Sequence, residues 1–360
     1  MIQFFNYSDF KKKLYIIFLF LSFFVVGFFD IITLASIPVV LTYIISPSKI
    51  LAYIPFPEIK FFFENSFQNF QIEKKIYLTS IVVISIFLIK NIIVYLINLF
   101  ESVYVRNLKF IMQKKVYSFF MQKPYYEFSN ISQAEIIRDY EFIHLTISHL
   151  RAWIISFKEV VVILGVILTM AITNFNLTLS IIIIFTFLLL LQFFFSRVIK
   201  KWGFKVVVLK KNVFNTLKDS YDFFLETRIA NKEKFFEKKL LSSAWELENY
   251  NFKTKLVNNI YKPLFETIFV AIIFFSLYFL IQNNYTLSEI IPFLTLFVVA
   301  LVRLMPSFNN LLNNVNMIKF SSASSNLVIA KYIKSYSDKT KYQNIKKFDI
   351  KKNIKVKNLS

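Results

Sequence analysis

Four ionisable side chains stand inside, or close to the ends of, long apolar runs: Asp30, Lys90, Glu266 and Arg303. Charged groups are costly within a bilayer, so they normally face the protein interior or a water-filled cavity. The planar guanidinium of Arg303 suits a phosphate or pyrophosphate better than the ammonium of a lysine does. We therefore predict that Arg303 and Lys90 line a cavity and attract an anionic headgroup, with Asp30 and Glu266 as further cavity residues.

The same four residues also have a structural interpretation. Asp30 with Lys90, or Glu266 with Arg303, could form ion pairs between helices and fix their register. Arg303 could instead extend its side chain to the membrane surface. The sequence leaves these alternatives open, because it does not show which face of each helix points inward.

The other residue types that commonly carry chemistry predict no further site. The chain has no Cys, which excludes disulfides and thiolate metal sites. His144 and His149 are five residues apart, off the i, i+4 spacing of a helical metal pair, and we expect no metal site and no catalytic residue. Lys158 and Glu159 fit the edge of a membrane span.

The elements that must position these residues are membrane helices. The chain of 360 residues is 56% hydrophobic and 18% charged, a balance typical of a bilayer protein. A span needs about 20 apolar residues, and six runs of that kind occur: 14–45, 76–99, 152–172, 177–199, 264–281 and 287–304. We predict an all-α membrane protein with six transmembrane helices, and Pro263 in the first turn of the fifth.

The distribution of charge gives the orientation. The connections 100–151 and 200–262 are rich in Lys and Arg, whereas 174–176 and 282–286 carry no charge. By the positive-inside rule both termini are cytoplasmic in a multi-pass protein of the plasma membrane. The same rule accounts for the formal charge of +21, so we predict no nucleic-acid partner.

The two basic connections are unusually long for a helix bundle. They mostly lack Gly and Pro, which indicates membrane helices that continue into the cytosol. Each has a break near its middle, with aromatic residues, that we interpret as a contact tip for another domain. The alternative is that these aromatic rings pack only on neighbouring helices. The tip residues are Pro124, Tyr125, Tyr126, Glu127 and Phe128 in the first connection, and Tyr221, Phe223, Phe224 and Glu226 in the second.

Two long intracellular hairpins, a tight turn at 174–177 and a long sixth helix together resemble the transmembrane half of an ATP-binding-cassette (ABC) exporter. Within that family, ALVRLMPS at 300–307 and FDIITLA at 29–35 are similar to the bacterial lipid-linked oligosaccharide flippases. The resemblance covers almost the whole chain. It implies a homodimer in membrane lipids, with the tips coupled to a nucleotide-binding domain.

The end of the sequence fits the same resemblance. Apolar residues alternate with Lys through 350–356, a pattern typical of a strand. We interpret 1–335 as the transmembrane domain, and 336–360 as a linker and the start of a nucleotide-binding domain. The phosphate loop G-x-x-x-x-G-K-[ST] does not occur in this sequence. ATP and Mg²⁺ would therefore bind a nucleotide-binding domain that is either fused after this chain or a separate polypeptide. We favour fusion.

The expected function is ATP-driven movement of an amphipathic lipid or lipid-linked glycan, with a peptide or drug as the alternative cargo. An ion-coupled secondary transporter is a further alternative, but such proteins use Gly and Pro interruptions and this chain has only 3 Gly. The third alternative is a membrane scaffold that transports nothing and recruits a partner through its basic tips. This chain alone carries no catalytic site, while the complete protein would hydrolyse ATP.

Overall fold

The computed structural model describes residues 10–45, 72–173, 175–282 and 287–334, and the predicted linker and strand at 336–360 lie outside them. The elements in these ranges are helical: α2 (Phe10–Ile45), α5 (Ile72–Met121), α6 (Tyr125–Ser129), α7 (Gln133–Thr173), α8 (Phe175–Asp222), α9 (Phe224–Ile229), α10 (Glu233–Gln282), α11 (Leu287–Val328) and the π-helix η1 (Ile329–Lys334).

Five of the helices are long and apolar enough to cross a membrane: α2, α5, α7, α8 and α10. The chain is therefore all-α in its described part, with five candidate spans, as expected of a multi-pass membrane protein. The sixth predicted span, 287–304, lies in the first half of α11. That it crosses the membrane stays a prediction.

The spans continue without a break into the polar connections, as predicted. α5 contains the apolar run 76–99 and then extends to Met121, adding about 30 Å beyond that run. α10 begins at Glu233 and reaches the fifth predicted span through Pro263, which lies inside the helix. The prediction of Pro263 in a first turn is thus wrong, because the helix tolerates the loss of one backbone hydrogen bond there.

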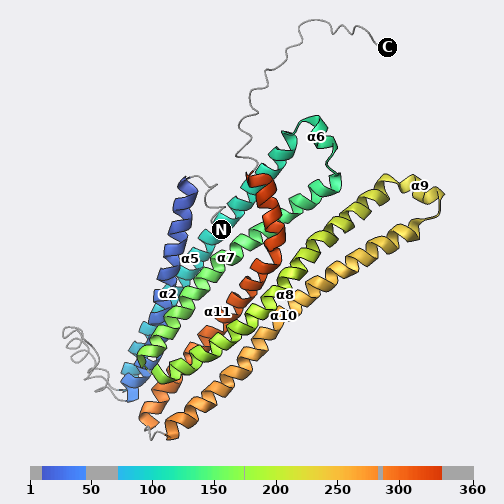
Figure 1. The fold of residues 1–360 in the computed structure, drawn as a ribbon. Helices are drawn as coiled ribbons and strands as arrows, with labels where there is room; N and C mark the ends of the chain where they lie inside the picture. The colour runs from blue at the N-terminus through green and yellow to red at the C-terminus, as the bar shows by residue number, and fades with distance from the viewer. Residues whose placement is uncertain (1–9, 46–71, 174, 283–286, 335–360) are drawn as a thin grey trace, which may run out of the picture.

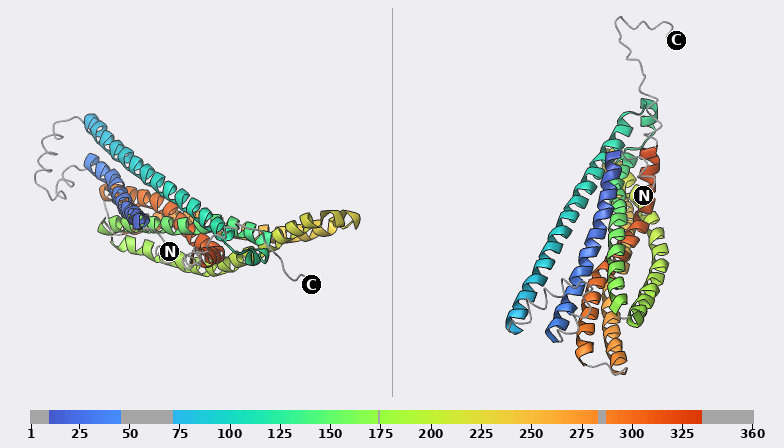
Figure 2. Two further views of the ribbon diagram at one scale, coloured as in Figure 1. Left: turned by 90° about the horizontal axis from the view of Figure 1, so that it is seen from above. Right: turned by 90° about the vertical axis from the view of Figure 1, so that its left-hand side faces the viewer.

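Two long hairpins dominate the shape of the molecule (Figure 1). α5 and α7 are joined by α6, and α8 and α10 are joined by α9, with both short helices at the same end of the molecule. The hairpins separate toward their tips, and the view from above shows α9 extending well past the rest of the bundle (Figure 2). α11 lies against α2, α7, α8 and α10 and so connects the two hairpins.

Aromatic packing holds the second hairpin against α11. The ring of Phe308 on α11 lies 4.4 Å from that of Phe185 on α8 and 5.0 Å from that of Phe265 on α10. All three side chains are buried. Such ring pairs add about 1 kcal/mol each to the free energy of burial, so this cluster is a main attachment of the second hairpin.

α8 and α11 lie very close together at Gly203. A Cβ atom at this position would lie 2.0 Å from the backbone oxygen of Phe320, a distance that only a movement of the two helices could relieve. Gly27 on α2 is also crowded, but there the nearest atom, at 2.9 Å, is the Cγ1 of Val161, which can rotate away. Small residues let helix backbones pack closely in this way.

We expect Gly203→Ala to lower the free energy of unfolding by about 2 kcal/mol, because overpacking forces the helix backbones apart. Gly27→Ala is the matched control and should lower the free energy of unfolding clearly less. Thermal unfolding of the purified proteins in one detergent measures both. Equal melting temperatures for the two variants would contradict the close approach of α8 and α11.

Candidate functional site

Three of the four predicted cavity residues meet at one point inside the bundle. The carboxylate of Asp30 on α2 lies 2.6 Å from Lys90 Nζ on α5 and accepts a hydrogen bond from Arg303 Nη2 on α11 at 2.7 Å. Asp30 is almost fully buried, with 1% of its side chain exposed, and Lys90 is nearly as buried. We call Asp30, Lys90 and Arg303 the charge cluster.

Within the charge cluster one carboxylate faces two cations, and a second buried carboxylate, Glu159 on α7, interacts electrostatically with Arg303 from outside it. The side chain of Arg303 keeps 34% of its surface exposed, and within the described residues its Nε has no hydrogen-bond partner. Lys90 Nζ also donates to Thr33 Oγ1 at 3.4 Å. The cluster therefore joins three helices, and only the exposed part of the Arg303 side chain, not its buried Nε, could meet an anion.

The ion pair of Asp30 with Lys90, one of the structural alternatives, is confirmed. The pair of Glu266 with Arg303 is not formed in the described part of the chain: Glu266 is exposed on α10, and Arg303 pairs with Asp30 instead. Glu266 therefore does not join the cluster. The reason is the helix face, because Glu266 is the next residue after the buried Phe265 and points away from the core.

Two residues near the cluster were not selected from the sequence. Thr33 stands three positions after Asp30, so the i, i+3 spacing of the two polar groups could have placed them on one face. Glu159 on α7 is buried and accepts a hydrogen bond from Asn310 Nδ2 on α11 at 3.2 Å. No pattern in the sequence distinguishes it from the half-buried Lys158 beside it.

The first predicted tip is the short helix α6, which Pro124 precedes with an extended backbone. Tyr125 and Tyr126 expose 84% and 69% of their surface, and Phe128 is also exposed. Glu127 is held by Lys123 Nζ at 2.8 Å, which fixes the start of the turn. The rings of this tip therefore do not pack only on neighbouring helices.

The second tip has the same character. Tyr221, Phe223 and Phe224 are exposed around the start of α9, and Glu226 lies exposed in its first turn. Asn231 closes the turn with a φ of 50°, a left-handed conformation that Asn adopts more readily than most residues. Both tips therefore present aromatic rings and a carboxylate at one end of the molecule (Figure 1).

The first hairpin is fastened to the end of α11 by a group of polar contacts near its tip. Tyr332 of η1 is fully buried and donates its hydroxyl hydrogen bond to Asp139 of α7. Lys331 donates to the same carboxylate at 2.8 Å and also to Glu135. A movement of this hairpin must therefore carry the end of α11 with it, or break these bonds.

Burial and the neighbouring carboxylate of Asp139 raise the pKa of Tyr332. We expect Tyr332→Phe to lower stability by about 1.5 kcal/mol at pH 8 by removing a hydrogen bond to a charged group. A raised pKa in the fold means that the contribution of the hydroxyl is complete below about pH 10, where tyrosine in the unfolded chain ionises. That contribution then falls as the pH rises further.

The melting temperatures of wild type and Tyr332→Phe should therefore converge between about pH 10 and pH 11. Tyr140→Phe serves as the control, because Tyr140 is exposed on α7. A difference between wild type and Tyr332→Phe that stays constant over this pH range would contradict the buried bond to Asp139.

A comparison of the chain with protein-family models finds no match. The proposals that follow therefore depend on the arrangement of the charge cluster and the two tips.

Proposed function

We propose that this chain is the transmembrane half of an ATP-driven ABC exporter that moves an amphipathic anionic lipid or lipid-linked glycan across the membrane. The observation that carries the proposal is the pair of long helical hairpins that end, on one side of the molecule, in short helices with exposed aromatic rings. ATP and Mg²⁺ would bind a nucleotide-binding domain, fused or separate, and the functional unit would be a homodimer with cytoplasmic tips.

The hairpins are suited to transmit movement. A continuous helix resists bending because each backbone bond supports the next, so a displacement at α6 or α9 reaches the bundle at the far end of α5 or α10. Exposed aromatic rings beside carboxylates are typical anchors for another protein domain. A domain that closes on ATP would therefore find both a contact surface and a lever at each tip.

The charge cluster supports an anionic cargo. A cation inside a candidate membrane region is costly unless a partner compensates it. Asp30 pairs with both Lys90 and Arg303, and the exposed part of the Arg303 guanidinium would fit a phosphate or pyrophosphate. The apolar residues of the surrounding helices would contact the lipid part of the same cargo.

A transport assay in vesicles tests the cargo. The chain with its ATPase domain, reconstituted in proteoliposomes with a fluorescent pyrophosphate-linked lipid, should move the lipid only with ATP and Mg²⁺. Replacing Lys90 and Arg303 together by Gln should reduce the rate at least tenfold, while Lys205→Gln, a lysine exposed on α8, should change it little. Unchanged transport by the double variant would remove the proposed role of the cluster.

A further inference from the structure

The exposed face of α8 changes character where the helix leaves its apolar run. Six exposed side chains follow one another on this face at spacings of three and four residues, and they are Leu190, Phe193, Phe194, Arg197, Lys200 and Lys201. The first three are apolar and the last three are cations. The face therefore turns from apolar to basic within one helical turn, between Phe194 and Arg197.

The position of this change matches the edge of a bilayer. α8 is a candidate membrane span, and its predicted apolar run is 177–199. From its first residue, Phe175, to Arg197 the helix rises about 33 Å, slightly more than the hydrocarbon thickness of about 30 Å. Arg197 therefore stands at the level of the lipid phosphates, and Phe194 stands at the level of the acyl chains.

The three cations have no carboxylate partner in the part of the chain that the structure describes. α8 itself contains no Asp or Glu before Asp219. Further along α8, Lys210 pairs with Glu141 of α7 at 2.7 Å, so a neighbouring helix compensates the charge there. Uncompensated cations at the edge of a membrane attract anionic headgroups.

The guanidinium of Arg197 is held in a position that suits a phosphate. Its Cζ atom lies 4.4 Å from the centroid of the Phe193 ring. This attraction keeps the cation at the end of the apolar face and uses none of its N–H groups in a hydrogen bond to an oxygen. The planar fork of an arginine matches two oxygens of one phosphate, whereas Lys200 and Lys201 add point charges beside it.

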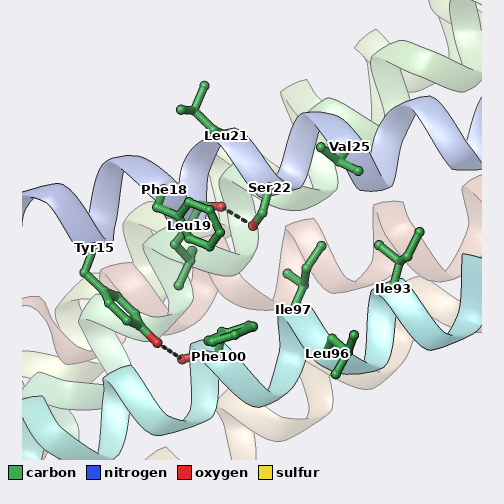
Figure 3. Close-up of a pocket in the computed structure, with 10 residues that line it drawn as sticks. All are labelled: Tyr15, Phe18, Leu19, Leu21, Ser22, Val25, Ile93, Leu96, Ile97 and Phe100. Carbon is green, nitrogen blue, oxygen red and sulfur yellow. Dashed lines mark hydrogen bonds between the residues drawn. The ribbon is translucent and has the colours of Figure 1, made fainter.

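The surface of α2 and α5 provides a contrast. The groove between these helices is lined by apolar side chains together with Tyr15 and Ser22, which donate to backbone carbonyls at 3.1 Å and 2.7 Å (Figure 3). No charged residue lines it, so its lining does not distinguish one lipid headgroup from another. On α8 the apolar face continues directly into cations. That continuity favours a phospholipid over a soluble phosphate, because one lipid molecule can contact both parts.

We propose that the exposed face of α8 binds one anionic phospholipid in the leaflet on the side of α6 and α9. Its acyl chains lie along Phe193 and Phe194, its phosphate is bound by Arg197, and Lys200 and Lys201 select a negatively charged headgroup. None of these residues belongs to the charge cluster. The bound molecule is a lipid of the surrounding membrane and not the transported cargo, so the proposal does not depend on the proposed function.

Native mass spectrometry of the full chain with added dioleoyl phosphatidylglycerol or dioleoyl phosphatidylcholine tests the site. Wild type should retain one phosphatidylglycerol more tightly than one phosphatidylcholine. A variant that combines Arg197→Gln, Lys200→Gln and Lys201→Gln should bind phosphatidylglycerol at least tenfold more weakly, because each cation near a membrane surface contributes about fivefold.

The matched control makes the same change of charge away from the edge of the membrane. It combines Lys234→Gln, Lys238→Gln and Lys239→Gln, three exposed positions in the part of α10 that follows α9. Position 239 lies about 33 Å along α10 from Tyr261, which contacts Gln192 of α8. This variant should retain phosphatidylglycerol as wild type does.

Photocross-linking in the otherwise unchanged chain gives a second measurement. A benzophenone amino acid at position 194, in bilayers with equal amounts of the two labelled lipids, should cross-link mainly to phosphatidylglycerol. Position 183 is exposed on the same face about 17 Å deeper in the bilayer. It should cross-link both lipids equally, because their acyl chains are identical.

Four results would overturn the proposal: equal retention of both lipids by wild type, equal binding of phosphatidylglycerol by wild type and the α8 variant, equal losses in the two triple variants, or the same ratio of cross-linked lipids from positions 194 and 183. Cross-links from position 194 to a second copy of the chain, in place of lipid, would also overturn it. Because ATP-driven transport enters none of these measurements, failure here leaves the proposed function to its own test.

Discussion

Replacing Asp30 by Asn is expected to destabilise the protein by about 3 kcal/mol, more than any other single substitution considered for this chain. Asn has nearly the shape of Asp, so the packing of α2 is preserved while the charge is lost. Lys90 and Arg303 would then face each other as unpaired cations in a site where Asp30 is almost completely buried. Thermal unfolding in one detergent measures the loss.

The matched control is Glu101→Gln, which removes the carboxylate that accepts a hydrogen bond from Arg151 at 3.1 Å. Arg151 keeps 52% of its side chain exposed, so water can solvate the cation that is left. This substitution should cost no more than about 1 kcal/mol. Equal losses for the two variants would show that burial of the charge cluster does not govern its energy.

A double variant separates charge from packing. Adding Lys90→Met to Asp30→Asn removes one of the two unpaired cations and keeps a side chain of similar length. The melting temperature should recover part of the loss, because a buried ion pair replaced on both sides costs less than one broken on a single side. A further decrease would mean that Lys90 contributes mainly through packing.

The second large effect is expected at the two tips. Tyr126→Ala combined with Phe224→Ala should reduce ATP-dependent transport at least tenfold, because exposed aromatic anchors contribute 2 kcal/mol or more at an interface. The melting temperature of the chain itself should not change, since both rings are exposed and stabilise little within it. Transport in proteoliposomes and thermal unfolding together give the two readouts.

Tyr117→Ala with Phe252→Ala is the control for this pair, because both rings are comparably exposed on the shafts of α5 and α10 and not at the tips. These variants should retain transport. If tip and shaft variants lose transport to the same degree, the loss comes from the bundle in general, and docking at α6 and α9 is not the cause.

Much of the fold followed from the sequence for simple reasons. The apolar runs have the length that a bilayer requires, and the lack of Gly and Pro after them predicts helices that continue, as α5 does to Met121. Pro124 predicted the break before α6, because proline ends the preceding helix. The same argument gave a wrong prediction at Pro263, because α10 continues through this proline.

The candidate site could be predicted only in part. Because burying charge is costly, Asp30, Lys90 and Arg303 could be selected from the sequence. That all three meet at one point could not be predicted. Their meeting depends on which faces of α2, α5 and α11 turn inward, and hydrophobic periodicity is weak in helices that are apolar on every side. For the same reason Glu266 was grouped with them, and the burial of Glu159 was missed.

Site-specific cross-linking from the tips tests the central claim most directly. A benzophenone amino acid is placed at position 126 in α6 or at position 225 in α9, both exposed, and at position 117 as the control. After irradiation of native membranes, the cross-linked peptides are sequenced. The account predicts peptides from a domain that carries the phosphate loop G-x-x-x-x-G-K-[ST], from both tips and not from position 117. Cross-links from the tips to lipid alone, or to the bundle alone, would contradict it.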